Sequence, residues 1–411
     1  VYFLPVFTRS FMAVVTSEDI TVAWGSQPPP CEIQTGRWRT AVFQDVQESS
    51  DGTLLYLLYD PIADERAPRN GGYRRADNCV VVFDLSLRCF TTTIPLTSCP
   101  GQLKFLFALR PITVGGDTRA VVVSEMKSGG GSVQLHFTLV NLTTQQMIPI
   151  THPLDVAHDY ICTIREDAPE LIVMANPGLQ VWCLAMDVLV PTQPIEYFRV
   201  EGAKLRHFYD GFICGSVVVL VSAHPDGNLD YTRIHLLDMQ TRSLTTYPCS
   251  PDPKRGFPVP RKQSAVVPVG GFIVVCGGES HGRGGVHRLN DYWRLHLNSF
   301  QWNQCIGEMP VPLIEPRLTT SYGGHAYLWG EWDGHLPGIA RGINHLRIIR
   351  VGGLDSEYES PVAPPMDQVK YASAPPPPYT DQPPPYTAQN PPYHDESFEK
   401  RKKKKECCTI L

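Results

Sequence analysis

The chain has 411 residues, which is more than one average domain but within the range of a single large β fold. Its residues are 42% hydrophobic and 19% charged, as in ordinary soluble globular proteins, and a net charge of −5 argues against general binding of nucleic acid. No run of about 18 apolar residues occurs, so we expect no membrane-spanning helix.

Residues 1–354 are predicted to form an all-β domain. Short β-branched and aromatic runs bounded by turn-forming residues recur along it, which is typical of β-strands, and no long stretch has helical periodicity. The clearest runs are TLLYLLYD at 53–60, NCVVVFDL at 78–85, RAVVVSEM at 119–126, ELIVMAN at 170–176, SVVVLVSA at 216–223, GGFIVVCGG at 270–278 and HAYLWG at 325–330.

A seven-residue pattern recurs along this domain: an acid or amide, an aliphatic residue, any residue, Thr or Ser, two further residues and a large apolar residue. We expect the Thr or Ser to support a tight turn and the apolar residue to pack an outer strand against the next blade. Five copies with first residues 52, 57, 97 and 58 positions apart, and an irregular copy near 186–197, predict a propeller of β-sheet blades. The five are EIQTGRW at 32–38, DLSLRCF at 84–90, NLTTQQM at 141–147, DMQTRSL at 238–244 and HLNSFQW at 296–302.

The fifth unit resembles the kelch repeat. It has the double glycine Gly277-Gly278 after an apolar strand, then NDYWRLHLNSFQW ending in Trp302, and the last unit has the related YGGHAYLWGEWDG at 322–334. The resemblance spans about residues 10–350 and implies a kelch-like β-propeller of four-stranded blades, six in number, with seven as the alternative. It also implies that one blade is closed by strands from both chain ends, joining EIQTGRW at 32–38 to strands around 317–350.

Residues 355–399 differ sharply in composition from the domain before them. They are rich in Pro, Tyr and polar residues and poor in aliphatic residues, so they cannot bury enough apolar surface to offset the entropy of ordering. We predict a disordered tail over 355–399, followed by a polybasic and prenylation segment over 400–411.

The last four residues, Cys408-Thr409-Ile410-Leu411, fit the C-a-a-X prenylation pattern, and the final Leu favours a geranylgeranyl group. One lipid chain gives only reversible anchoring, and a second signal is needed for stable residence at a membrane. An anionic membrane surface would attract the basic run, and palmitoylation of the neighbouring Cys407 is a further candidate. The alternative interpretation of the basic run is a nuclear localisation signal. The run comprises Lys400, Arg401, Lys402, Lys403, Lys404 and Lys405.

Two copies of the P-P-x-Y motif lie in the tail and predict binding of WW-domain proteins, because such segments adopt polyproline II structure and dock in aromatic grooves. The alternative interpretation is a stiff spacer. A third site fits N-P-x-Y and resembles tail signals that phosphotyrosine-binding domains or endocytic adaptors recognise. The contact residues are Pro376, Pro377 and Tyr379, then Pro383, Pro384 and Tyr386, and for the third site Asn390, Pro391 and Tyr393.

We find no pattern that indicates catalysis, a metal or a cofactor, and we expect no enzymatic activity. The 12 cysteines form no C-x-x-C pair, and ten of them are predicted to be reduced core residues. His325, Glu331 and His335 gather in one segment, which we interpret as propeller loop residues, although a metal or active site is the alternative. SGGGS at 128–132 predicts a hairpin tip rather than a phosphate-binding loop.

Together these features predict a lipid-anchored adaptor at the cytoplasmic face of a membrane, with the cytoplasm or the nucleus as alternative locations. The propeller would bind a protein partner through inter-strand loops, first of all through the arginine-rich insertion at 63–77. Two other functions stay open. One is a propeller enzyme similar to galactose oxidase, and the other is a ubiquitin-ligase substrate receptor with a further domain upstream of Val1.

Overall fold

The computed structural model describes residues 14–20, 43–60, 78–109, 118–150, 153–165, 170–186, 196–282, 284–321, 323–332, 334–337 and 343–351. All of them belong to one compact unit, Val1–Val362. The part of the chain that the structure describes contains no helix with the length and hydropathy of a membrane span.

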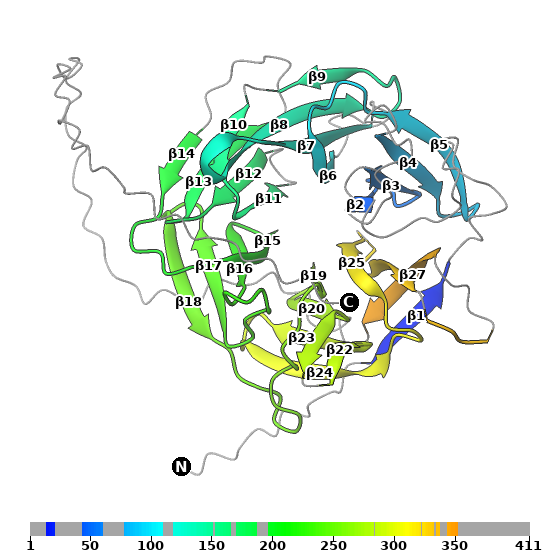
Figure 1. Ribbon diagram of the computed structural model, residues 1–411, viewed down its shortest axis with the longest axis vertical. Helices are drawn as coiled ribbons and strands as arrows, with labels where there is room; N and C mark the ends of the chain where they lie inside the picture. Colours follow the sequence, from blue (N-terminus) through cyan, green and yellow to red (C-terminus); the bar gives the residue numbers. More distant parts are fainter. Residues whose placement is uncertain are drawn as a thin grey trace, which may run out of the picture. The chain divides into compact units, whose positions relative to one another are not determined.

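Six antiparallel sheets follow one another around a ring, and each forms a blade that extends outward from the centre (Figure 1). From its innermost to its outermost strand, blade A has β2 (Phe43–Glu48), β3 (Leu54–Tyr59), β4 (Cys79–Asp84) and β5 (Cys89–Pro95). In the same order, blade B has β6 (Gln102–Leu109), β7 (Arg119–Lys127), β8 (Ser132–Asn141) and β10 (Leu154–Ala157), and β9 (Met147–Pro149) also pairs with β8. Blade C has β11 (Tyr160–Arg165), β12 (Glu170–Ala175), β13 (Gln180–Ala185) and β14 (Glu196–Arg199).

The second half of the ring repeats this plan with one insertion. Blade D has β15 (Phe208–Cys214), β16 (Val217–Ser222), β17 (Arg233–Asp238) and β18 (Ser243–Pro248). Blade E has β19 (Ala265–Val269), β20 (Phe272–Cys276), β23 (Asp291–His296) and β24 (Gln301–Glu308), with the hairpin β21 (Glu279–Gly282) and β22 (Gly285–Arg288) inserted. Blade F has β25 (Ile314–Thr320), β26 (Ala326–Trp332), β27 (Ile343–Val351) and β1 (Val15–Asp19).

The predicted all-β class and six-bladed propeller are confirmed. Six of the seven apolar runs in the sequence are the second strands of the six blades, and the run at 78–85 is a third strand. A second strand has a strand on each side and a neighbouring blade on each face, so it is apolar throughout rather than alternating. The predicted hairpin tip at 128–132 joins β7 to β8, where Ser128 N–H donates to the carbonyl oxygen of Ser132 at 3.1 Å.

Blade F is closed by a strand from the N-terminal region, as expected, but by a different segment from the expected one. Strand β1 pairs antiparallel with β27, from Val15 opposite Val351 to Asp19 opposite Arg347. The Arg347 side chain donates to Asp19 Oδ2 at 2.8 Å, which fixes this register. The outermost position of blade F therefore belongs to residues 15–19, and EIQTGRW at 32–38 lies outside the described residues.

The turn that follows the third strand has the same construction in four blades. Asp84 Oδ1 accepts hydrogen bonds from the backbone N–H groups two and three residues later, both at 2.8 Å. Asn141 and Asp238 do the same in blades B and D, and His296 Nδ1 accepts one such bond in blade E. The first residue of the pattern, rather than the Thr or Ser that we expected, therefore holds the turn. The fifth residue is left-handed each time, with φ of 52° to 62° at Arg88, Gln145, Arg242 and Phe300.

The seventh residue of the pattern packs toward the preceding blade, not the next one as expected. Trp302 of blade E lies with Tyr231 and Val219 of blade D in one buried cluster. Its indole N–H donates to the Tyr231 carbonyl oxygen at 2.9 Å, and the two rings meet edge-on at 5.2 Å. Its counterparts Phe90, Met147 and Leu244 likewise lie in clusters shared with the preceding blade.

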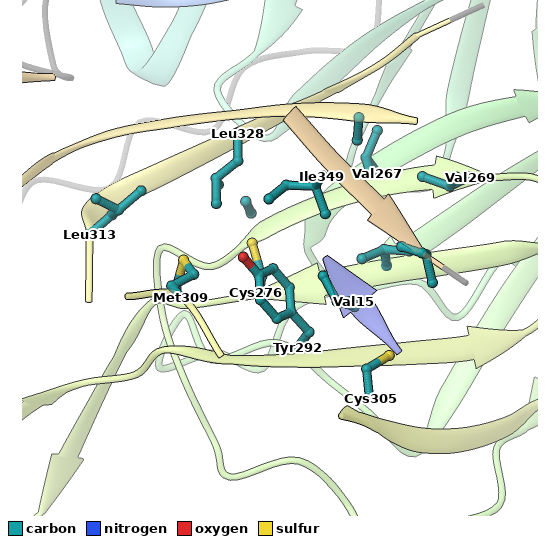
Figure 2. Packing of buried hydrophobic residues seen from close by; sticks show 14 of the residues in the cluster. Val15, Val267, Val269, Cys276, Tyr292, Cys305, Met309, Leu313, Leu328 and Ile349 are labelled. Atoms are coloured by element: carbon teal, nitrogen blue, oxygen red, sulfur yellow. The ribbon is translucent and has the colours of Figure 1, made fainter. Parts of the chain in front are cut away.

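The core consists of six apolar clusters, one at each interface between neighbouring blades. Figure 2 shows the cluster between blades E and F, where Leu328 and Ile349 of blade F face Val267 and Cys276 of blade E. Val15 of the closing strand contributes to the same cluster. The interface between blades E and F is therefore incomplete without the N-terminal strand.

The double glycine of blade E is required by its surroundings. Gly277 and Gly278 have φ of 60° and 87°, and a Cβ on Gly278 would lie 2.5 Å from the Lys262 carbonyl oxygen. Only glycine adopts this backbone conformation without strain and allows so close an approach. These two glycines, which contributed to the resemblance to kelch repeats, thus allow the end of strand β20 to approach the connection from blade D closely.

Candidate binding site at the central channel

Three charged residues lie on the innermost strands of three blades, and they influence one another electrostatically. Asp45 lies on β2 of blade A, Asp210 on β15 of blade D, and Arg317 on β25 of blade F. Blades A and D are opposite each other in a ring of six, so Asp45 and Asp210 belong to opposite sides of the ring. We call these three residues the channel cluster.

Each member of the channel cluster follows a β-bulge. The pairing register shifts between Phe43 and Asp45 in β2, between Phe208 and Asp210 in β15, and between Ile314 and Arg317 in β25. A bulge bends a strand and changes the direction of the side chain that follows it, and bulges are common beside binding sites. The three charged residues therefore share one local feature, a bulge in the strand just before them.

The Asp45 carboxylate is half-buried and is held by backbone N–H groups. Asp45 Oδ2 accepts a hydrogen bond from the N–H of Leu106 in blade B at 2.9 Å, and Oδ1 accepts one from Val46 at 2.8 Å. Burial raises the pKa of Asp45 to about 6, although these hydrogen bonds and the charge of Arg317 act in the opposite direction. Asp45 thus joins blades A and B by a hydrogen bond, although burial makes the ionised form of its carboxyl less favourable than in water.

Asp210 is less well supported than Asp45. Among the described residues, its donor is the N–H of the next residue, Gly211, at 2.8 Å. Burial raises the pKa of Asp210 to about 7, Arg317 and the Gly211 hydrogen bond lower it, and the charge of Asp45 raises it further. Burial is thus the main reason that both carboxyls have a pKa above the usual range for Asp.

Arg317 is exposed, and it is paired with Trp329 of the neighbouring strand β26. Within the described part of the chain, no carboxylate lies within ion-pair distance of its guanidinium group. The Trp329 indole N–H is buried and has no acceptor among the described residues. The cluster thus has a guanidinium group and a carboxylate that are not paired with each other directly.

Further polar contacts hold the inner strands on either side of the channel cluster. The Tyr209 hydroxyl accepts a hydrogen bond from Ser264 N–H at 2.7 Å and joins blade D to blade E. The Tyr160 hydroxyl of blade C donates to Glu125 Oε2 of blade B at 2.7 Å, and Lys104 lies 3.6 Å from the same carboxylate oxygen. These contacts fix the inner strands relative to one another, which preorganises the channel wall.

The histidine segment of blade F is divided by the fold. His325 precedes strand β26, Glu331 lies near its end, and His335 follows it. Six residues of strand place His325 and Glu331 about 20 Å apart at roughly 3.3 Å per residue. Over the described residues, no group of three His, Cys, Asp or Glu side chains has an arrangement that could hold a metal ion.

The predicted tail and loop sites lie outside the residues that the structure describes. These are the lipidation cysteines, the basic run, the proline–tyrosine motifs and the insertion at 63–77.

Sequence reasoning missed the channel cluster because an isolated Asp or Arg in a strand carries no local signal. A comparison of inner-strand positions between blades, aligned on the second-strand runs, would have found three charges where an apolar residue is expected.

Comparisons with known proteins give short sequence matches. No protein-family model matches the chain. The chain is 29% identical over 98 residues to kelch domain-containing protein 10 of Xenopus laevis, a match that covers 24% of this chain and 23% of that protein. The human protein of the same name matches at the same identity over 24% of this chain and 21% of its own length. The match thus spans less than a quarter of these curated relatives.

Two solved structures are similar to the propeller at low sequence identity. One is the structure of YjhT, with a TM-score of 0.48, 10% identity and coverage of 76% of this chain and 98% of that one. The other is the α-L-arabinofuranosidase Arb93A from Fusarium graminearum, with a TM-score of 0.47, 12% identity and coverage of 83% and 97%. The sequence match to kelch-domain proteins, taken with the six blades, supports a kelch-type propeller.

Proposed function

We propose that this protein is a membrane-tethered interaction adaptor. The kelch-type propeller, whose fold suggests a role in protein interaction, would bind a protein partner, and the proline–tyrosine motifs of the tail would recruit WW-domain proteins. A prenyl group on Cys408, with the basic run at 400–405, would hold the assembly at the cytoplasmic face of a membrane. The observation that carries the proposal is the joint occurrence of the terminal C-a-a-X pattern, the basic run and two P-P-x-Y motifs behind one propeller.

The Cys408→Ser variant is expected to move the protein from the membrane fraction to the soluble fraction of a eukaryotic cell. A thioether to the prenyl group needs the cysteine sulfur, and the basic run alone supplies only a screened electrostatic attraction of at most about 1 kcal/mol per residue. Cell fractionation of the intact protein and the variant is the measurement, with Ser397→Ala in the same tail as the control. Equal distribution of intact protein and variant would contradict the lipid anchor.

The double variant Tyr379→Ala and Tyr386→Ala is expected to abolish capture of a tandem WW-domain protein without changing membrane attachment. Each tyrosine is the last residue of a P-P-x-Y motif, and two linked motifs raise the affinity through effective concentration. Capture by an immobilised tandem WW protein, beside fractionation of the same variant, is the measurement. The single variants should each retain weak capture, and full capture by the double variant would rule out the WW interaction.

A further inference from the structure

We propose that the propeller itself contacts the anionic membrane, through the connection between blades D and E. The contact surface consists of residues 252–262, which we call the D–E loop, and the β21–β22 hairpin. Both lie at the end of blade E where β19 begins and β20 ends. This inference rests on the proposed function, because it names the part of the propeller that meets the lipid once the chain is tethered.

Three large apolar side chains are exposed on this surface. Phe257 and Val259 of the D–E loop are 37% and 49% exposed, and Val286 of the hairpin is 53% exposed. The loop and the hairpin are joined by two backbone hydrogen bonds between Lys262 and Glu279, both at 2.9 Å. Because this bridge is antiparallel, the chain from Lys262 back to Val259 and the chain from Glu279 forward leave it in the same direction. Apolar side chains that are exposed on adjoining segments indicate a contact surface.

The exposure of Phe257 and Val259 is fixed by their surroundings. Pro258 between them is buried and restricts the backbone, so the two neighbouring side chains face outward. Arg261 is 0% exposed, and it donates to the Val259 carbonyl oxygen at 3.1 Å while it is bound to Asp291 at 2.6 Å and 3.0 Å. The loop therefore cannot turn these apolar side chains inward without breaking buried polar contacts.

Exposed basic side chains accompany the apolar ones. Lys254 and Arg255 form the tip of a tight turn, which is closed by two backbone hydrogen bonds between Asp252 and Gly256 at 3.0 Å and 2.9 Å. The Asp252 carboxylate accepts hydrogen bonds from the N–H groups of Lys254 at 2.8 Å and Arg255 at 3.0 Å, so it is held against the backbone of its own turn. Lys262 adds a further basic side chain at the other end of the loop.

The balance of charge on this surface is positive. The D–E loop has four basic residues and one acidic residue, and its formal charge of +3 becomes +2 when the pairing of Arg261 with Asp291 is counted. In the hairpin, Arg288 lies 3.6 Å from Glu279, so the two charges compensate each other. Asp226 of the β16–β17 connection lies beside the loop and lowers the total to +1. Complementarity therefore favours an anionic partner.

A phospholipid surface fits this combination better than an acidic protein does. At the boundary of an anionic bilayer, Lys and Arg pair with headgroups while apolar side chains enter the acyl region. Phe257, Val259 and Val286 project from a loop and a hairpin, whereas the apolar anchors of protein interfaces are typically enclosed in packed pockets. The proposed anchor would also hold the propeller next to lipid, which raises the effective concentration of this contact.

The first test measures insertion of the D–E loop. The full chain carries Cys408→Ser so that no prenyl group is attached, and the basic run still attracts it to vesicles of phosphatidylcholine and phosphatidylserine that contain brominated lipid. Phe257→Trp and Leu87→Trp each add one indole to the seven of the chain. Leu87 is 70% exposed in the turn after β4, at the opposite ends of the strands. We expect bromine quenching to increase in Phe257→Trp and to stay at the level of the parent chain in Leu87→Trp.

The second test measures binding without a new tryptophan. Phe257→Ser combined with Val259→Ser should weaken sedimentation of the same chain with these vesicles by a factor of about three or more, because two apolar side chains no longer enter the bilayer. Leu87→Ser, which removes an apolar side chain of equal or greater exposure from the other end of the propeller, should leave sedimentation unchanged.

Each outcome supports or overturns the proposal. Equal quenching in the two tryptophan variants, no added quenching in Phe257→Trp, or no sedimentation of the parent chain would overturn it. Full sedimentation of the Phe257 and Val259 double variant would also overturn it and would leave the surface to a protein partner. If the D–E loop variants fail while the parent chain still sediments and the intact protein is still released by Cys408→Ser in cells, the lipid anchor stands and only the propeller contact is wrong.

Discussion

Replacing Arg261 with methionine is expected to lower the free energy of unfolding by about 3–5 kcal/mol, the largest loss that we expect from a single polar residue. The Arg261 side chain is 0% exposed and makes a bidentate pair with Asp291, at 2.6 Å and 3.0 Å. It also donates to the carbonyl oxygens of Gly277 and Val259, both at 3.1 Å. Methionine fills much of the volume but leaves the Asp291 charge and two carbonyl groups without these donors.

The electrostatics of Asp291 explain why the loss is large. Burial alone would raise the pKa of this carboxyl, but the hydrogen bonds and charge of Arg261 hold it below the usual value. The Trp293 indole N–H donates to the same carboxylate at 2.7 Å, so the pair anchors both the start of β23 and the double-glycine turn. Chemical denaturation of the intact protein and the variant measures the difference.

A matched control exists in an exposed ion pair. Arg88 lies 2.6 Å from Glu18, but their side chains are 54% and 39% exposed, and such pairs contribute about 0–1 kcal/mol. Arg88→Met should therefore change stability by less than about 1 kcal/mol. The double variant Arg261→Met with Asp291→Asn should be more stable than Arg261→Met alone, because it leaves no unpaired carboxylate buried at position 291. A loss of similar size in Arg88→Met and Arg261→Met would mean that burial is not the cause.

The blades could be predicted from the sequence because the signal repeats. Every second strand is apolar on both faces, and the recurring turn needs a side-chain acceptor at its first position, as in Asp84 and Asp238. The closing strand could not be predicted, since VTSED at 15–19 has an ordinary pattern and gains its place only through pairing with β27. The paired residues of β1 and β27 are more than 320 positions apart in the chain, so no local sequence pattern can indicate this contact.

The candidate site could not be predicted from the sequence for the same reason. Asp45 and Asp210 are ordinary polar residues in their own strands, and only the closed ring brings them to opposite sides of one axis. The tail motifs were found readily because each is a short linear pattern that needs no fold. Linear motifs and repeated strands are thus accessible from sequence, whereas a site assembled from three blades is not.

The Asp210→Asn variant is expected to be more stable than the intact protein at pH 8 and close to it at pH 4. Burial and the Asp45 charge raise the pKa of Asp210 from 3.8 to about 7, so the folded state favours the neutral acid. A raised pKa of an acid contributes stability that is fully present below the unfolded value and is lost as pH rises to the folded value. The loss therefore develops between pH 3.8 and about 7 and stays constant above that range.

The size of this effect follows from the shift. Each pKa unit corresponds to about 1.4 kcal/mol, and because Asp210 is partly exposed to solvent, we expect a gain of about 2–4 kcal/mol at pH 8. Asparagine keeps an oxygen for the Gly211 N–H and removes the charge, so the fold has no reason to change. Thermal unfolding of the intact protein and the variant across this pH range is the measurement, with Asp155→Asn as the exposed control. A variant that is less stable than the intact protein at pH 8 would show that the Asp210 charge is stabilising.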